Sequence, residues 1–291
     1  MKTRRFFIIA AAAASLAAVA TSCDKENNNP GSGSEQEVAF IKLKSIETTT
    51  VEPDYGQAEK SVYEFNWIEG GNRLASFKYD VYAFVFDEES EGYSTESYHD
   101  RKQETIFTWK EDGSADYVRT DEAWGSNSGQ WWDQGTSSGS LAFNEDGYLQ
   151  QNSYKKDKYS YKQTYEYEGK YIAKIDLGGD VYTFNWENDD LVSVKSNSAT
   201  FTFTYSSEVN PITKGVNPLF LDILGNNEFQ ALGIAGLFPA HLPEKCTLAS
   251  MGGDMVWSFT YEKDAQGRLS KMKVTFPEMW GGISKTYSFV Y

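Results

Sequence analysis

Cysteine and histidine are scarce in this chain. Its 291 residues include two cysteines, Cys23 and Cys246, and two histidines, His99 and His241. There is no Cys-x-x-Cys pair, and two imidazoles are too few for a histidine-rich zinc site. No cofactor-binding motif stands out along the chain. The sequence therefore predicts a protein without a metal centre and without a cofactor.

Positive charge is also in short supply. The chain has 27 lysines and arginines against 42 acidic residues, which gives a net charge of −15 at pH 7. Nucleic-acid binding depends on clustered basic side chains that neutralise phosphates. The composition therefore argues against a nucleic-acid partner, and it gives the protein no electrostatic attraction to an anionic bilayer.

The chain lacks an apolar run long enough to span a bilayer as a helix. Its longest run, residues 6–20, has 15 residues, whereas a spanning helix needs roughly 20. The run follows a basic head of Lys2, Arg4 and Arg5 and leads through small residues to Cys23, which is the layout of a secretory signal. The small residues before Cys23 resemble a lipobox, so we expect residues 1–22 to be a lipoprotein signal peptide and Cys23 to carry the lipid. The alternatives are ordinary cleavage just before Cys23 and, from the arginine pair, a twin-arginine signal.

A polar stretch follows the cysteine. Residues 24–34 contain no side chain able to form a core, so residues 23–37 are predicted to be a flexible tether and residues 38–291 the folded domain. The charged residues Asp24, Lys25 and Glu26 resemble the surface-export signal of Bacteroidetes lipoproteins. We therefore expect an outer-membrane lipoprotein of the cell envelope, on the outer rather than the periplasmic face.

Aromatic residues make up 15% of the chain, and in the domain they alternate with polar ones. Alternation with a period of two places each aromatic set on one face of a β-strand. The clearest sets are Tyr63, Phe65 and Trp67; Tyr82, Phe84 and Phe86; Tyr182, Phe184 and Trp186; Phe201, Phe203 and Tyr205; Trp257, Phe259 and Tyr261; and Tyr287, Phe289 and Tyr291.

Turns rich in Gly, Asp and Asn separate many of these strands from a second strand that opens with leucine, as at Leu74, Leu149, Leu191 and Leu269. Each unit is predicted to be a β-hairpin. The expected fold is mainly all-β, with repeated antiparallel hairpins forming an extended or curled sheet. Residues 216–238 are apolar without alternation and are interrupted by Asn-Pro and Gly-Asn-Asn, which predicts one or two short helices there.

Two resemblances support this prediction. The run Gln266-Gly267-Arg268-Leu269, following Tyr261 and Asp264, resembles the tyrosine-aspartate repeats of Rhs-type β-structures. Residues 159–291 as a whole resemble a Bacteroidetes family of lipoproteins of unknown function. The resemblance implies a β-rich, envelope-anchored protein and implies no site residues.

Catalytic motifs are few. Residues 135–139 match the G-x-S-x-G pattern of a nucleophile elbow, but a Gly/Ser/Trp segment precedes them and a strand follows, so a flexible loop is the better interpretation. His241 lies in an apolar stretch and is interpreted as a packing or capping residue. The acidic residues leave a two-carboxylate glycan hydrolase open, although no motif singles out a pair.

The strongest hint of recognition lies in residues 124–135, where Trp124, Trp131 and Trp132 stand among glycine and polar residues. Indole rings beside Asn, Gln and Asp suit stacking on sugars or contact with a protein. The alternative is that the rings cover an end of the core. The favoured function is a non-enzymatic envelope or cell-surface lipoprotein that binds a glycan or another envelope protein or joins an assembly, and the alternative is a carboxylate-based glycan hydrolase.

Overall fold

The protein is described by a computed structural model that covers residues 40–52, 57–87, 92–125, 129–212, 214, 236–249 and 253–291, with backbone only at 57, 85–87 and 92–98. The predicted signal peptide, Cys23 and the tether lie outside these residues. None of the described helices is both long enough and apolar enough to cross a membrane.

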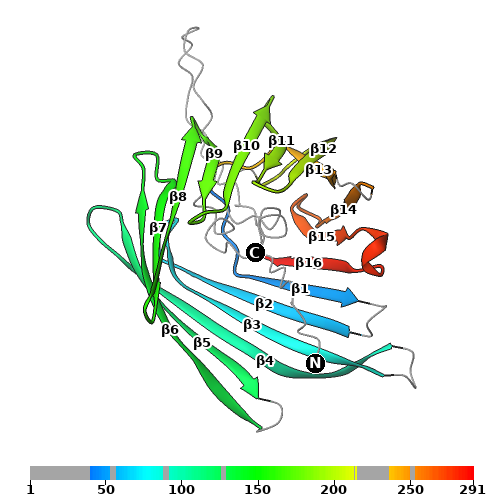
Figure 1. Ribbon diagram of the computed structural model, residues 1–291. Coiled ribbons are helices and arrows are strands. Elements are labelled where there is room, and N and C mark those ends of the chain that lie inside the picture. Colours follow the sequence, from blue (N-terminus) through cyan, green and yellow to red (C-terminus); the bar gives the residue numbers. More distant parts are fainter. Residues whose placement is uncertain are drawn as a thin grey trace.

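The described residues form sixteen strands (Figure 1). The first eight are β1 (Ser45–Glu52), β2 (Gln57–Trp67), β3 (Leu74–Asp87), β4 (Gly92–Trp109), β5 (Ala115–Gly125), β6 (Gln130–Phe143), β7 (Leu149–Lys156) and β8 (Tyr159–Glu168). The others are β9 (Tyr171–Asp176), β10 (Val181–Glu187), β11 (Asp190–Lys195), β12 (Thr200–Val209), β13 (His241–Leu248), β14 (Met255–Lys263), β15 (Leu269–Thr275) and β16 (Ser284–Val290).

Every strand pairs antiparallel with its neighbours in sequence, and β1 also pairs with β16 over seven residues, from Ser45 opposite Val290 to Val51 opposite Ser284. The sheet is therefore a closed barrel. The prediction of an extended or curled sheet was correct in strand type and pairing but wrong in leaving the sheet open. Closure joins the two ends of the domain, and it removes the exposed sheet edges that an open sheet of this size would carry.

The expected helices over 216–238 fall mostly outside the described residues, and the part that is described, residues 236–238, is not helical. Within the described ranges the helical segment is a single 3-10 turn, η3 (Glu278–Trp280). It lies between β15 and β16. The prediction of a helix is therefore wrong for residues 236–238, and residues 216–235 lie outside the described residues.

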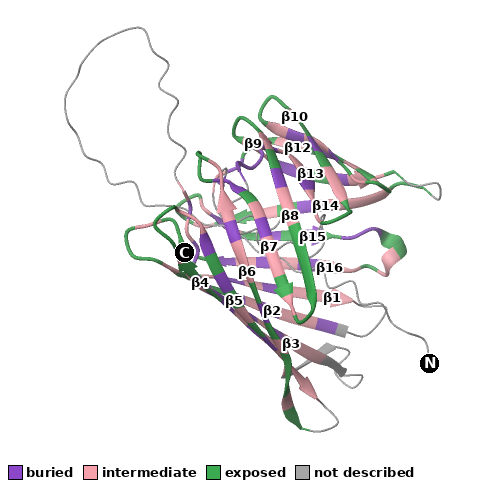
Figure 2. Ribbon diagram, turned by 60° about the vertical axis from the view of Figure 1, so that its left-hand side comes forward, coloured by how far each residue is buried: buried purple, intermediate pink, exposed green. Residues whose placement is uncertain are grey.

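The two faces of the barrel wall differ in polarity. Along β2, Tyr63 and Phe65 are buried while Glu64 and Asn66 are exposed, and the same alternation runs through the other strands (Figure 2). The buried set faces the interior, as expected for strands that bury one face. The outward set is mostly Ser, Thr, Lys and Glu, for example Thr183, Asn185 and Glu187 on β10, Thr200, Thr202 and Thr204 on β12, and Lys271, Lys273 and Thr275 on β15.

A repeated hydrogen bond links successive strands at one end of the barrel. An inward aromatic in the second half of an even-numbered strand, or just beyond its end, donates from its indole N–H or phenol O–H to a backbone carbonyl at or near the start of the preceding strand, at 2.5–2.8 Å. We name this set the aromatic ladder. Its pairs are Trp67 with Leu43, Trp109 with Leu74, Tyr167 with Leu149, Trp186 with Ile172, Tyr205 with Leu191, Tyr261 with Pro243 and Tyr291 with Leu269.

The ladder accounts for the recurring Trp or Tyr in the sequence repeat, because these rings carry a donor; the acceptor is a backbone carbonyl and does not itself require leucine. β6 ends in Phe143, which has no polar atom to donate, and its ring instead stacks on Trp109 with centroids 5.4 Å apart. Burial of the ladder phenols disfavours their charged form and raises the pKa of Tyr167, Tyr205 and Tyr261 above the ordinary value.

Candidate functional site

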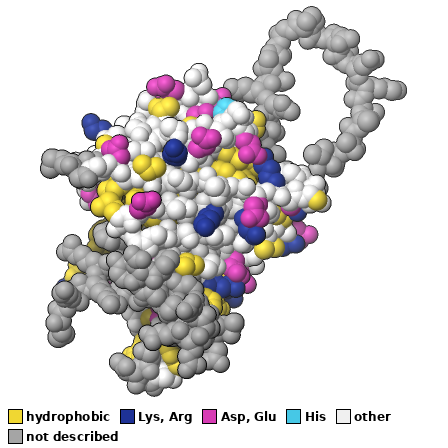
Figure 3. Space-filling model, turned by 90° about the vertical axis from the view of Figure 1, so that its right-hand side faces the viewer, with side chains coloured by type: hydrophobic (Ala, Val, Ile, Leu, Met, Phe, Trp, Pro, Cys, Tyr) yellow, Lys and Arg dark blue, Asp and Glu magenta, His cyan; other side chains and the backbone are white. Residues whose placement is uncertain are grey.

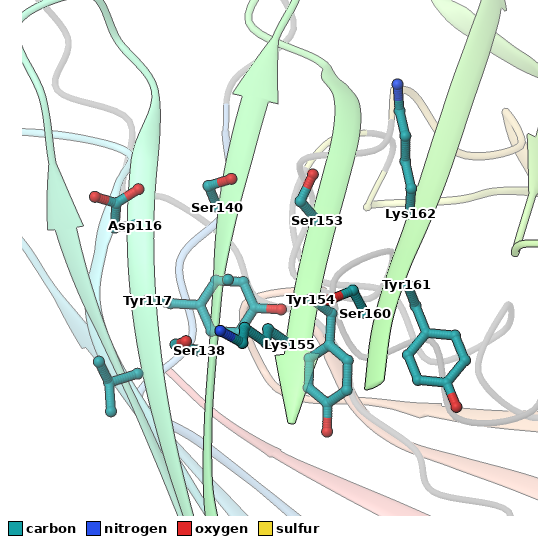
Figure 4. A pocket seen from close by; sticks show the side chains of 12 residues that line it. Asp116, Tyr117, Ser138, Ser140, Ser153, Tyr154, Lys155, Ser160, Tyr161 and Lys162 are labelled. Atoms are coloured by element: carbon teal, nitrogen blue, oxygen red, sulfur yellow. The ribbon is translucent and has the colours of Figure 1, made fainter. Parts of the chain in front are cut away.

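A hollow of about 650 Å³ lies across β5, β6, β7 and β8 (Figure 4). Its outward-pointing side chains form two rows that follow the strand register. One row is Asp116, Ser140, Ser153 and Lys162, and the other is Val118, Ser138, Lys155 and Ser160. We name this hollow the serine groove. Serine is the smallest polar residue that these positions could hold, so four of them leave space between longer neighbours.

Gly139 shapes the floor of the serine groove. A Cβ at this position would lie 2.3 Å from the Ser153 carbonyl oxygen and 2.4 Å from the Tyr117 ring. The bare backbone lets the Tyr117 ring pack against β6 from inside the barrel, where its hydroxyl donates to Asn152 Oδ1 at 3.1 Å. Close packing from beneath therefore requires glycine here.

The G-x-S-x-G match is a structural feature of β6. Residues 135–139 lie within this strand, so the expected flexible loop is wrong, and the strand-turn-helix geometry of a nucleophile elbow is not present. Gly135 has φ 94° and sits where the pairing of β5 with β6 shifts register. Gly135 thus allows a bulge in the strand, and Gly139 allows the close packing of Tyr117.

The charge of the serine groove is positive. Asp116 is its single carboxylate and pairs with Lys110, Nζ to Oδ1 2.7 Å. Lys155 and Lys162 are exposed and have no ion pair with any described carboxylate. With one carboxylate in its lining, the groove does not offer the two-carboxylate arrangement that glycoside hydrolysis needs.

The three tryptophans do not share a surface. Trp124 and Trp131 are cross-strand partners at the far end of the β5–β6 hairpin, with ring centroids 5.6 Å apart. Trp132, 51% exposed, is adjacent to Trp131 on the same strand and so points to the opposite face of the wall. The prediction of a polar loop carrying all three rings is therefore wrong, because both strands of the hairpin continue through these residues.

A polar and aromatic cluster surrounds Trp131 on the outer face. The His99 ring meets the Trp131 ring edge to face at 4.7 Å and stacks on Tyr82 at 4.6 Å. His99 Nε2 lies 2.7 Å from Asp80 Oδ1, and Lys102 Nζ lies 4.5 Å from the Trp131 ring centroid. These contacts hold Trp131 against the wall as a half-buried ring.

His241 and Cys246 have contacts that stabilise the fold. The His241 backbone N–H and its Nδ1 both contact the Asp190 carboxylate, at 2.9 and 2.8 Å, which ties β13 to the start of β11. Cys246 is 1% exposed, and burial raises the pKa of its thiol to about 12. Among the described residues no group of three or more His, Cys, Asp or Glu side chains is placed to hold a metal ion.

The fold of this chain, but not its sequence, is similar to that of a known protein. No family model and no curated protein matches the sequence. Among solved structures the chain is similar to a porin-like protein from Bacteroides uniformis, with a TM-score of 0.60 and 15% identity over 85% of this chain and 96% of that one. The two share a fold. At this identity the likeness shows the barrel architecture and nothing about a site.

The serine groove is the feature that sequence reasoning missed. Its local signal is visible as serines at 138, 140, 153 and 160 with lysines at 155 and 162. The alternation assigns each residue to a face of its own strand, but it does not give the register between strands. The barrel supplies that register and brings the four serines together.

Proposed function

We propose that this protein is a lipid-anchored β-barrel of the cell envelope that faces water on its outer surface and acts by binding rather than by catalysis. Cys23 would hold it to the membrane and residues 23–37 would separate the barrel from the bilayer. The barrel shared with a porin-like protein supports an envelope protein at the level of fold.

The observation that carries the proposal is the polarity of the outer wall. Opposite charges face each other across neighbouring strands in four ion pairs, which are Lys78 with Glu104 (3.8 Å), Lys102 with Glu122 (2.8 Å), Lys174 with Glu166 (2.6 Å) and Lys271 with Glu262 (3.0 Å). Figure 3 shows charges of both signs scattered over one face, with only small apolar patches.

A membrane-spanning barrel has the opposite arrangement. Its outward side chains form an apolar band, and one lysine facing lipid at the bilayer midplane costs about 2–4 kcal/mol. Its interior is polar when it conducts water. The buried residues here are mainly apolar and aromatic, among them Tyr117, Tyr165 and Tyr287, with a smaller polar set that includes Gln103, Asp121 and Lys285. The polarity therefore favours a barrel that stands in water and needs a separate anchor.

Replacement of Cys23 tests the anchor. In cells, the wild-type chain is expected in the membrane fraction, and Cys23→Ala is expected to be exported, folded and soluble without detergent, because no acyl chain remains to supply about 0.8 kcal/mol per buried CH₂. Cys246→Ala is the matched control, since it removes the other thiol and should leave the protein with the membrane.

The opposite result would identify an integral barrel. If Cys23→Ala stays in the membrane fraction and needs detergent for extraction, the outer wall contacts lipid and the proposal fails.

Protease treatment of intact cells tests the proposed position on the outer face, where the wild-type barrel should be cleaved or shed without cell lysis.

A further inference from the structure

We propose that the serine groove binds an acidic oligosaccharide, one that carries carboxylate or sulfate groups on a chain of sugar hydroxyls. The inference rests on the proposed water-facing barrel and names the ligand class of its binding surface. It is drawn from the charge, the hydrogen-bonding groups and the shape of the groove.

The charge around the groove is opposite in sign to the net charge of the whole chain. The protein has a net charge of −15, yet residues 149–164, which supply β7 and most of β8, contain four lysines and one aspartate. Two of these lysines, Lys155 and Lys162, line the groove from adjacent strands. Because Lys110 already pairs with Asp116, the two ammonium groups are available to an anion.

The hydrogen-bonding groups suit a polyhydroxylated chain. Four serine hydroxyls lie between the charged residues, and each hydroxyl both donates and accepts. Each row crosses four strands, which at about 4.8 Å per strand spans about 14 Å. Figure 4 shows Asp116, Ser140, Ser153 and Lys162 projecting on the same side, side by side. Strand pairing fixes the backbone positions from which these groups project.

The shape of the groove suits a short chain better than a membrane surface. It is an open hollow of about 650 Å³ that extends across four strands. A flat bilayer meets the tips of protruding side chains, whereas Ser140 and Ser153 are only partly exposed and are reached more easily by a chain that lies in the hollow. Val118, 48% exposed, and Tyr161, 52% exposed, add apolar surface beside the polar groups, and Tyr154 also lines the groove. These side chains suit the apolar face of a sugar ring.

The test compares the wild-type full chain, purified in a neutral detergent, with two charge-matched double variants. Lys155→Gln/Lys162→Gln removes the groove ammonium groups, and Lys245→Gln/Lys273→Gln removes two exposed lysines on β13 and β15. Binding of trigalacturonate and of neutral maltotriose is measured by calorimetry. Cosedimentation is compared between vesicles with and without anionic lipid, because the acyl chain at Cys23 would bind vesicles of either kind.

Wild type is expected to bind trigalacturonate and not maltotriose, with affinity falling as salt rises. The groove variant should weaken binding about tenfold, and the control variant should bind as wild type does. Equal weakening in both variants, no binding of trigalacturonate, or binding of anionic vesicles alone overturns the proposal. These outcomes are independent of the Cys23 experiment, so failure of the ligand assignment is distinct from failure of the water-facing barrel.

Discussion

At the scale of single residues, the serine groove depends on what is missing at one position. Gly139 has no Cβ, and this absence lets the Tyr117 ring lie directly beneath β6. Core packing leaves little free volume, so one added methyl group is felt when its neighbours cannot move. Here one neighbour is the Ser153 backbone carbonyl, which the β6–β7 ladder holds in place.

Gly139→Ala is expected to destabilise the barrel by roughly 1–3 kcal/mol, because the new methyl overlaps backbone and ring. Urea unfolding followed by tryptophan fluorescence measures the change. Gly71→Ala is the control, since a Cβ there meets nothing closer than 3.9 Å, and it should shift stability by no more than about 0.5 kcal/mol. Equal unfolding midpoints for the two variants would contradict the role assigned to Gly139.

At the scale of strands, the aromatic ladder joins each hairpin to the one before it. The donor lies in the second half of its strand or just beyond it, and the acceptor carbonyl lies near the start of the preceding strand, so each bond helps to set how far one strand is shifted along the other. A buried phenol that donates such a bond must stay protonated. Because burial raises the pKa of Tyr205 and Tyr261 above the ordinary value of 10.0, their contribution is fully present below pH 10 and is lost as pH rises toward the folded-state pKa.

Wild-type stability is therefore expected to fall steeply above pH 10, and Tyr205→Phe/Tyr261→Phe should fall less steeply. At pH 7 the double variant should lose about 1 kcal/mol for each hydroxyl removed. Thermal unfolding between pH 7 and 11 measures both effects. Tyr159→Phe, whose ring is 55% exposed, is the control and should match wild type at each pH. A double variant with the wild-type slope would show that the ladder phenols do not govern alkaline unfolding.

At the scale of the whole molecule, closure of the barrel depends on the pairing of β1 with β16, which we name the seam. β1 and β16 lie at opposite ends of the sequence, and their register places Glu47 opposite Ser288 on the outer face. Directly opposed residues have Cβ atoms about 4.5–5.5 Å apart, within a small backbone adjustment of disulfide geometry. The seam can therefore be tested by crosslinking.

Glu47→Cys/Ser288→Cys is expected to form an intrachain disulfide on mild oxidation, seen as faster migration on a non-reducing gel, and to raise the melting temperature. A disulfide that closes a loop of this length contributes up to about 5 kcal/mol. Glu47→Cys/Lys271→Cys is the control, because Lys271 lies one strand beyond Ser288, about 10 Å from Glu47, and should not crosslink. Crosslinking of neither pair would indicate an open sheet in solution.

The sequence by itself determined most of the strands, their antiparallel pairing and the alternation of faces within each strand. This was possible because alternation is a property of neighbouring residues, as in Tyr63 to Trp67, and because turn residues such as Asn188 and Asp189, with φ 52° and 66°, mark hairpins locally. The sequence wrongly predicted loops at 124–135 and 135–139, where β5 ends and β6 runs.

Only the tertiary structure decided closure, register and the grouping of side chains across strands. The β1–β16 seam joins residues about 240 positions apart, and no local pattern encodes such a pairing. Ser138, Ser153 and Ser160 lie on three successive strands, and the register of β6, β7 and β8 is what places them in one groove. The physical reason is that a strand's own residues set which face each side chain takes, while hydrogen bonding to its neighbours sets which residues stand side by side.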